Sequence, residues 1–417
     1  MRDVDREESH AGERPVGVAL SARYLPELES LRGIAMLLVF LFHLDVVSRG
    51  RLLRVGEVVV SPALAYVVAG HSGVDLFFVL SAFLLCLPFL AQAAGGRPVS
   101  VPHYFARRAL RILPLYYAAV IVASILRAAT PADLLRGLPY LFLLNGFAGM
   151  TTPLPPYSNV WWSLATEAQF YVVLPFLPLV LRSRLGRLAG AAAVVLWAGA
   201  YAAFLRGELH AQTIEGQLTL GLSLFGRAPL FLAGIAAAWF YYHHGEYWRR
   251  RLAAVPLLRN GGADLFLLAL ITTLGYLLRW AVWIGATRVK APPFHAWHVP
   301  VAVLWAALLV VLLIAPLRLK PLFSNRVLNR LGVLSYSIYI VHVPVQTYVL
   351  YFCRHRWTSF LGWNAYTALA ASVIGVLCVA LAELTYRAIE RPFLIRKEQL
   401  RTVGGGAPAV QLSETPG

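Results

Sequence analysis

An arginine and a histidine interrupt an otherwise apolar stretch near the start of the chain, Leu31 to Asp45. Arg32 and His43 are eleven residues apart, and eleven steps of about 100° return a helix to nearly the same face. The two side chains would then lie about 16 Å apart along that face. An ionisable group deep in an apolar helix is costly to place there, so His43 is a candidate functional residue. A hydrogen-bonded packing histidine is the structural alternative.

Two carboxylates occur in later apolar stretches. Asp75 begins the stretch that contains Ser81, and Glu167 follows Ser163 by one helical turn on the same face. A glutamate inside an apolar segment typically faces a cavity or a partner, so we expect a functional role for Glu167. Ser81 would line a narrow polar seam, or would simply let neighbouring helices approach closely. Trp162 marks an interface, where indole rings are favoured.

Three arginines stand together at one end of a further apolar stretch, at positions Arg107, Arg108 and Arg111. Guanidinium groups pair bidentately with phosphate, so this cluster, joined by Arg32, would suit an anionic ligand that carries phosphates. The alternative is that these arginines only set the orientation of the chain in a membrane.

Further polar residues lie in the second half of the chain. Arg227 would be either a snorkelling anchor or the partner of a buried carboxylate such as Glu167. Ser335, Tyr339 and His342 fall on one face of a predicted helix, where they would contact a ligand or form a hydrogen-bonded seam between helices.

The remaining candidates indicate structure more than chemistry. Glu390 and Arg391 precede Pro392, which predicts a surface ion pair and the end of a helix. His295 and His298 flank a proline-rich loop without a third ligand, so no metal site is expected. Three cysteines, at positions 86, 353 and 378, lack metal or redox spacing and are expected to fill the core.

The composition sets the class of protein. Of the 417 residues, 59% are hydrophobic and 14% are charged, and the mean hydropathy is +0.65. Such a chain is a polytopic membrane protein. The net charge of +17 does not indicate nucleic-acid binding, because the basic residues lie between apolar segments instead of forming a patch with aromatic residues.

Ten apolar segments have the length that a bilayer requires. They are residues 31–48, 74–94, 112–129, 161–181, 188–206, 227–243, 263–283, 298–317, 332–352 and 364–388. Most lysines and arginines fall on one side of this arrangement, which predicts that both termini are cytoplasmic. The segment Leu138–Phe147 is too short to cross and is predicted to be interfacial or re-entrant. The first 22 residues lack the apolar region of a signal peptide.

Several of these stretches together resemble one known family. They are ELESLRGIAMLLVFLFHL, GVDLFFVLSAFLL, RRALRILPLYY, WSLATEAQFYVVLP, FGRAPLFLAG, LGVLSYSIYIVHVP and the final Glu-Arg-Pro. In this order they resemble the acyltransferase-3 family of integral membrane O-acyltransferases. The resemblance divides the chain into a polar N-terminal tail (1–23), an acyltransferase-3-like membrane domain (24–395) and a flexible C-terminal tail (396–417).

The resemblance implies an activity, and it implies roles for the residues above. An acyl group, usually acetyl, would pass from cytoplasmic acyl-CoA to a hydroxyl of a carbohydrate or lipid-linked sugar, in the inner or plasma membrane. His43 and Glu167 would be catalytic, and Arg32, Arg107, Arg108, Arg111 and Ser81 would bind the donor. Trp162, Ser163, Arg227, Tyr339 and His342 would bind the acceptor.

The chain departs from the family pattern at two positions. Ala82 stands where glycine is common, which is sterically mild, and Ala168 stands where a second acidic residue often follows the glutamate. No appended hydrolase-like domain is evident, so the membrane domain is expected to carry the transfer.

A hypothesis joins the helical geometry to the resemblance. The phosphates of acyl-CoA would lie on the arginines, and the pantetheine arm would follow the Arg32 face to present the thioester at His43. His43 would act as general base or form a transient acyl-imidazole. The alternative from another class is a proton-coupled transporter, because intramembrane histidine, glutamate and arginine also form relays.

Overall fold

The computed structural model describes residues 25–49, 61–146, 152–208, 214–288, 292–353 and 365–403. The predicted N-terminal tail, 1–23, and residues 404–417 of the predicted C-terminal tail lie outside this part of the chain. The described residues form helices and no strand. Ten of these helices are long and apolar enough to cross a membrane, which confirms the predicted all-helical, polytopic fold.

The structure describes sixteen α-helices, numbered in the order of the chain. Their bounds are α2 Pro26–Arg49, α3 Pro62–Val68, α4 Ser72–Ala93, α5 Val101–Arg127, α6 Leu138–Leu141, α7 Trp162–Val173, α8 Leu177–Arg182, α9 Arg184–Leu205, α10 Ile214–Leu222, α11 Leu224–Ala254, α12 Ala263–Arg288, α13 His298–Ile314, α14 Lys320–Phe323, α15 Arg326–Cys353, α16 Ala365–Thr385 and α17 Arg391–Val403. Short 3₁₀ turns lie at Pro131–Gly137, Leu144–Gly146, Ser158–Val160, Leu174–Phe176 and Pro292–Trp297, and π-helical turns lie at Leu258–Gly262 and Tyr386–Glu390.

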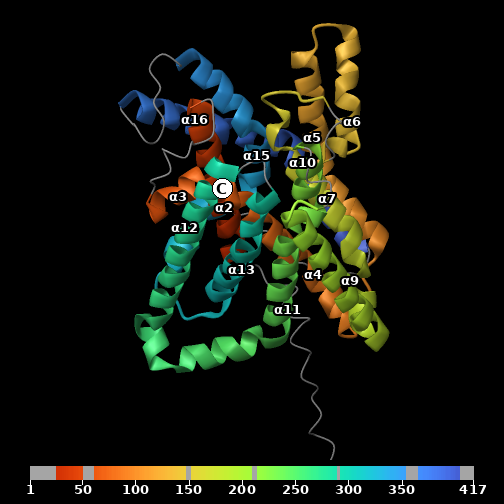
Figure 1. Ribbon diagram of the computed structural model, residues 1–417, viewed down its shortest axis with the longest axis vertical. Coiled ribbons are helices and arrows are strands. Elements are labelled where there is room, and N and C mark those ends of the chain that lie inside the picture. The colour runs from red at the N-terminus through yellow and green to blue at the C-terminus, as the bar shows by residue number, and fades with distance from the viewer. Residues whose placement is uncertain are drawn as a thin grey trace, which may run out of the picture.

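Helix α2 lies at the centre of the bundle, between α15, α4 and α3 (Figure 1). Glycines bring α2 and α15 together, since a Cβ added to Gly33 would lie 2.2 Å from the carbonyl oxygen of Leu328. A Cβ added to Gly332 would lie 1.9 Å from the carbonyl oxygen of Glu29. Because these contacts are between backbones, the first crossing is fixed closely against the ninth. The helix that carries Arg32 and His43 is thus internal.

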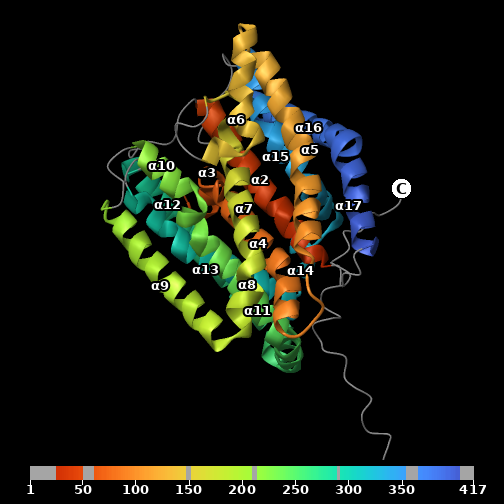
Figure 2. The same cartoon turned by 90° about the vertical axis from the view of Figure 1, so that its right-hand side faces the viewer.

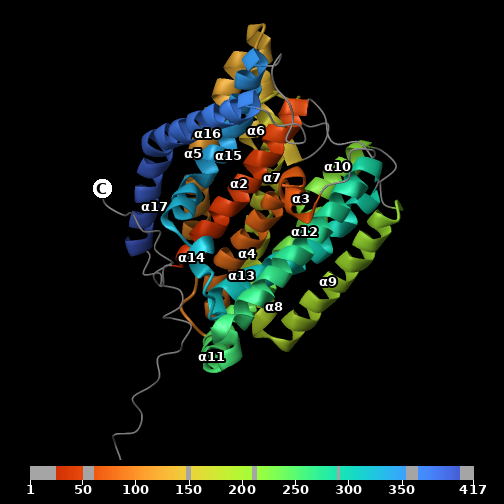
Figure 3. The same cartoon turned by 90° about the vertical axis from the view of Figure 1, so that its left-hand side faces the viewer.

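The other helices enclose this centre unevenly. Helix α11 packs on α4 and α13, while α9 lies at the outer edge of the molecule (Figures 2 and 3). Only 11% of the apolar window of α9 is buried. Such a helix would face lipid, as a helix at the rim of a membrane bundle does.

The predicted non-crossing segment Leu138–Phe147 is described except for its last residue, and its described part, 138–146, is too short to span, as predicted. It forms the four-residue helix α6 and a 3₁₀ turn beside the end of α5 (Figure 2). Tyr116 donates a hydrogen bond to the carbonyl oxygen of Tyr140 at 3.0 Å, and Tyr117 donates one to Leu141 at 3.0 Å. These bonds attach the segment to α5.

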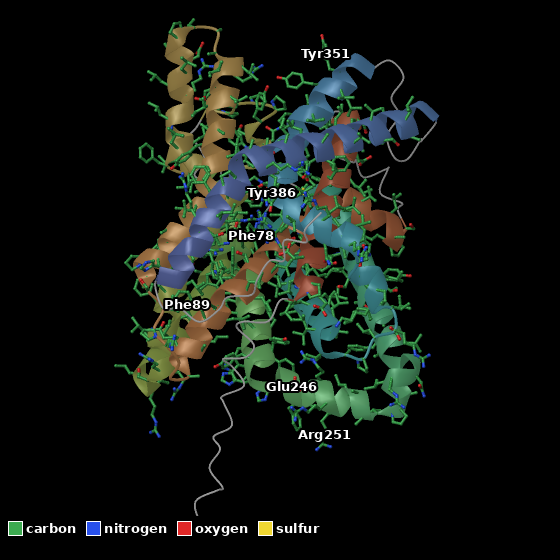
Figure 4. The ribbon with its side chains drawn as sticks, turned by 180° about the vertical axis from the view of Figure 1, so that it is seen from behind. Phe78, Phe89, Glu246, Arg251, Tyr351 and Tyr386 are labelled. Atoms are coloured by element: carbon green, nitrogen blue, oxygen red, sulfur yellow. The ribbon has the colours of Figure 1, made fainter. Side chains whose placement is uncertain are left out.

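The end of the last crossing differs from the prediction. Instead of stopping at Glu390, the chain passes through a π-helical turn into α17, which continues to Val403. Pro392 does not prevent this, because a proline in the first turn of a helix removes no intrahelical hydrogen bond. Figure 4 places Tyr386 near this bend. Glu390 is 3% exposed and is not a surface residue.

Candidate active site

Two histidines from the central helix pair face each other. His43 of α2 and His342 of α15 have ring centroids 5.0 Å apart in a T-shaped arrangement. Nε2 of His342 lies 3.3 Å from Nδ1 of His43. His43 is partly buried, whereas His342 is fully buried. The sequence predicts that His342 contacts the acceptor substrate. In the structure it lies directly against His43, the predicted catalytic histidine.

The ring of His43 is oriented by its own helix as well. Its Nδ1 lies 2.9 Å from the carbonyl oxygen of Val39. Since a carbonyl oxygen only accepts, Nδ1 carries the hydrogen and Nε2 keeps its lone pair. A neutral imidazole in this form is able to take a proton at Nε2.

Arg32 lies at the other end of the same helix in a charged environment. Its guanidinium is 3.8 Å from the carboxylate of Glu29, one turn earlier. It also interacts electrostatically with Glu167, Glu390 and Arg111. The structure therefore gathers carboxylates around Arg32 in addition to the predicted arginines.

Arg111 belongs to an ion pair that the sequence did not predict. Its guanidinium donates to a carboxylate oxygen of Glu390 at 3.1 Å, and the hydroxyl of Ser337 donates to the other oxygen of this carboxylate. The prediction of a surface ion pair at Glu390 was wrong, because packing of the last helices on α5 buries this carboxylate against Arg111. Since its charge is matched, Arg111 is less suited to phosphate than a guanidinium without a carboxylate partner.

Arg107 and Arg108, both partly exposed, lie one turn from Arg111. The guanidinium of Arg108 lies 5.9 Å from the ring centre of Tyr171. Its Nε has no hydrogen-bond partner among the described residues. Arg108 thus has donor capacity left for a ligand.

Glu167 is held near this arginine end of the site. The hydroxyl of Ser81 donates to its carboxylate at 2.5 Å, and Tyr171 on the same helix interacts with it electrostatically. Glu167 and Ser81 are both partly buried. The sequence did not predict this contact, because Ser81 and Glu167 lie 86 positions apart.

Arg227 has a different carboxylate partner from the one that the sequence suggested. Its guanidinium lies 3.5 Å from Asp75 and 3.0 Å from Nδ1 of His298. The guanidinium carbon is also 5.1 Å from the ring centre of Trp162. Arg227 is 5% exposed, which excludes a snorkelling anchor. Glu167, the suggested partner, lies with Ser81 instead.

The side chains around Arg227 form a second polar cluster, which consists of His71, Asp75, Trp162, Arg227, Trp297 and His298. The first polar cluster, at the arginine end, consists of Arg32, Ser81, Arg107, Arg108, Arg111, Glu167 and Glu390. The sequence analysis did not select His71, Asp75 or His298 of the second cluster as site residues. Asp75 is 2% exposed and His298 is fully buried, with their side chains 3.7 Å apart. His71 lies 5.0 Å from Phe42 and 5.1 Å from Trp297, measured between ring centres. Their signal in the sequence was weak, since Asp75 and His298 each begin an apolar stretch and His71 precedes one.

Several polar atoms of the second cluster have no hydrogen-bond partner in the described part of the chain. They are Oδ2 of Asp75, Nε of Arg227, Nε1 of Trp297 and both ring nitrogens of His71. A buried polar atom without a partner costs on the order of 1–3 kcal/mol. So many together indicate a region suited to polar groups.

Ser163 and Tyr339 join α7 to α15 between the two clusters. Their hydroxyl oxygens are 2.7 Å apart, and the hydroxyl of Tyr339 donates to the carbonyl oxygen of Val160 at 2.7 Å. Both side chains are buried. The ring of Tyr339 lies 5.8 Å from that of His342. Among the described residues, no group of three or more His, Cys, Asp or Glu side chains could hold a metal ion.

Known proteins of stated activity are similar to this chain. It is 26% identical over 400 residues to peptidoglycan O-acetyltransferase OatA of Listeria monocytogenes, which covers 90% of this chain and 56% of that protein. It is 28% identical over 168 residues to a putative peptidoglycan O-acetyltransferase of Bacillus subtilis, covering 37% of this chain and 23% of that protein. A putative O-acetyltransferase of Staphylococcus aureus is 23% identical over 157 residues, with 38% of this chain and 22% of that protein covered.

The chain therefore spans about half the length of the first relative and less than a quarter of the other two. No solved structure matches it. The sequence model of a protein family described as 'Acyltransferase domain', however, matches residues 25–383. This range contains both polar clusters except Glu390, and it confirms the resemblance inferred from the sequence motifs. The chain thus has the helices of a multi-pass membrane protein, and it belongs to the acyltransferase-3 family.

Proposed function

We propose that this protein transfers an acetyl group from cytoplasmic acetyl-CoA to a hydroxyl of a carbohydrate on the opposite side of the inner or plasma membrane. The single observation that carries the proposal is the partly exposed His43 on the central helix, with Nδ1 occupied by Val39 and Nε2 left as a base. The names of the relatives, which describe O-acetyl transfer and in two cases peptidoglycan, support the choice of group and acceptor.

The donor would bind at the arginine end of the site. Arg107 and Arg108 would hold the phosphates of the CoA moiety, because bidentate guanidinium contacts match phosphate geometry. Arg32 would continue this path toward His43. Arg111 and Ser81 were predicted in the same role, but each is engaged by a carboxylate, so we propose that they shape the donor site through Glu390 and Glu167.

The chemical step needs one base and no metal. Nε2 of His43 takes the proton of the acceptor hydroxyl while that oxygen attacks the carbonyl carbon of the thioester. The carbon–sulfur bond then breaks, and the protonated His43 returns the proton to the CoA thiolate. The new ester, free CoA thiol and neutral histidine balance the reaction. Glu167 would act beside the donor, by holding Ser81 and Tyr171 in place.

The acceptor would approach through the second polar cluster. Trp162 offers an aromatic face, and Arg227 with Asp75 offers a donor and an acceptor for sugar hydroxyls. Ser163 and Tyr339 would line the passage between this cluster and His43. The acceptor is a carbohydrate or a lipid-linked sugar, and membrane lipids surround the protein. Nucleic acid has no part in the proposal.

Thiol release tests this proposal directly. Purified protein in detergent is given acetyl-CoA and a soluble peptidoglycan fragment, and free thiol and acetylated product are measured. We expect His43→Ala and His43→Gln to lower kcat by about 10²- to 10⁴-fold, the usual contribution of a general base. His244→Ala, which changes an exposed histidine of α11, serves as the matched control.

Two results would contradict the proposal. If His43→Ala transferred acetyl at the wild-type rate, His43 would not be the general base. If wild-type protein released no thiol with any of several glycan acceptors, the alternative of a proton-coupled transporter would be favoured.

A further inference from the structure

The contacts of His342 give its ring one fixed arrangement of hydrogens. Its Nδ1 lies 2.9 Å from the carbonyl oxygen of Tyr339 and 3.1 Å from that of Ile338. Both partners are acceptors, so Nδ1 must carry the hydrogen. In the neutral ring Nε2 then has only a lone pair, and this atom faces Nδ1 of His43 at 3.3 Å.

The hydrogen bonds between the two helices therefore run in one direction. A backbone carbonyl of α15 accepts from His342, His342 accepts from Nδ1 of His43, and the lone pair on Nε2 of His43 is left for an incoming hydroxyl. Reversing the tautomer of His43 would place two lone pairs, those of Nδ1 and of the Val39 oxygen, against each other. It would also occupy Nε2 with a hydrogen and remove the base.

Val39 alone cannot fix this arrangement relative to the rest of the site. Its carbonyl belongs to the same helix as His43 and also accepts the backbone hydrogen bond of that helix. His342 comes from a different helix, so it fixes the ring of His43 with respect to α15. Because His342 is fully buried and contacts backbone on its other side, it is not placed to touch a substrate directly.

We infer that His342 is the positioning residue of the site: it shares the Nδ1 hydrogen of His43 with the carbonyl oxygen of Val39, and so helps to hold the tautomer with hydrogen on Nδ1 and orients Nε2 for proton transfer. This inference rests on the proposed role of His43 as base. The sequence predicts that His342 binds the acceptor substrate. We propose instead that His342 acts on the reaction through His43. When His43 becomes protonated, its Nδ1 hydrogen is shared with His342 in a stronger, charge-assisted bond.

Kinetics of three variants test the positioning role. His342→Leu removes the acceptor at similar bulk, and His342→Gln restores an acceptor oxygen. Gln346→Leu is the matched control, since Gln346 is equally buried one turn further on and joins the same two helices by donating to Phe40 at 2.9 Å. We expect His342→Leu to lower kcat about 10- to 100-fold, as loss of an orienting partner does.

Three further measurements distinguish a loss of positioning from a loss of folding. The KM for acetyl-CoA should stay unchanged in His342→Leu, His342→Gln should recover part of the lost kcat, and Gln346→Leu should keep the wild-type kcat per folded molecule. Equal kcat values in wild type and His342→Leu would overturn the inference. So would equal losses in the leucine and glutamine variants, since these indicate packing alone.

A second measurement requires no turnover. Nitrogen-15 NMR of histidine-labelled protein reports which ring nitrogen carries hydrogen, and the His43 signals are identified as those missing in His43→Gln. We expect Nδ1–H in the wild type and a growing share of Nε2–H in His342→Leu. A wild-type spectrum with Nε2–H overturns the inference even if no variant folds. If His43→Gln remains active, the proposed function fails, while the spectra still show whether His342 sets the tautomer.

Discussion

The arginines of the 107–111 cluster differ in what faces them. Arg111 is matched by the buried carboxylate of Glu390, whereas Arg108 is partly exposed and keeps an unpartnered Nε within the described structure. Charge alone does not distinguish these residues. Only a group without a carboxylate partner can offer its full charge to a phosphate, because a neutralised ion pair attracts an anion weakly.

This difference predicts opposite effects of the same substitution. Arg108→Gln should raise the KM for acetyl-CoA about tenfold, the effect of losing about 1.4 kcal/mol of binding, with little change in thermal stability. Arg111→Gln should instead destabilise the protein by about 3–5 kcal/mol, since it leaves Glu390 as an unpaired buried charge. Steady-state kinetics and thermal unfolding in detergent measure the two effects.

The double variant Arg111→Gln/Glu390→Gln is the control for the ion pair. It should recover much of the stability that Arg111→Gln loses, because no unpaired charge remains. A stable Arg111→Gln protein with a selectively raised KM would show instead that Arg111 binds the donor.

At the scale of helices, the site depends on how closely α2 and α15 approach. The backbones meet at Gly33 and Gly332, and the two histidines lie further along the same helix pair. Interhelical approach of this kind needs small residues, since van der Waals packing is a main attraction between helices in lipid. The spacing between His43 and His342 is therefore set in part by glycines that carry no chemistry.

Substituting one of these glycines should damage the site from a distance. In Gly332→Ala the added Cβ would meet the carbonyl oxygen of Glu29 at 1.9 Å, so the helices must separate. We expect a loss of about 1–3 kcal/mol in stability, as for other overpacked cores, together with a lower kcat. Thermal unfolding and thiol release measure both.

Gly375→Ala on α16 is the matched control for this change. A Cβ at Gly375 meets no atom within 4 Å, so the variant should be neutral or stabilised by about 0.5–1 kcal/mol. An unchanged Gly332→Ala protein would show that α2 and α15 can separate without consequence.

At the scale of the whole molecule, the two polar clusters lie toward opposite ends of the membrane-crossing helices. Asp75, Arg227 and His298 all lie at or near the first turn of their helices, while Arg107 and Arg108 lie at the start of α5, which runs the opposite way in the predicted arrangement. The predicted positive-inside orientation puts the arginines in the cytoplasm, where acyl-CoA is found. The second cluster then faces the other side.

Labelling of single cysteines tests this orientation in cells. The turn Pro131–Gly137, which contains Arg136, follows α5, whose end lies at one end of the molecule (Figure 1). The C-terminal part of α11, which contains Arg250, lies at the opposite end. The side chains of Arg136 and Arg250 are 51% and 80% exposed. In a variant without the three native cysteines, Arg136→Cys should react with a membrane-impermeant maleimide in intact cells. Arg250→Cys should react only after permeabilisation, and the reverse pattern would contradict the predicted orientation.

The sequence by itself determined the number of crossings, the non-crossing segment at 138–147 and the family. It also placed Arg32 and His43 on the first crossing. These are local properties, since hydropathy and helical period depend only on residues close together in the chain.

Only the tertiary structure decided which polar groups meet. Glu390 with Arg111, Asp75 with Arg227 and Glu167 with Ser81 are pairs drawn from different helices, far apart in the sequence. Every crossing presents similar apolar faces to its neighbours, so the order of side chains along one helix does not reveal which face it turns toward another. The contact between His342 and His43, on which the inferred tautomer depends, arises for the same reason from the packing of α15 on α2.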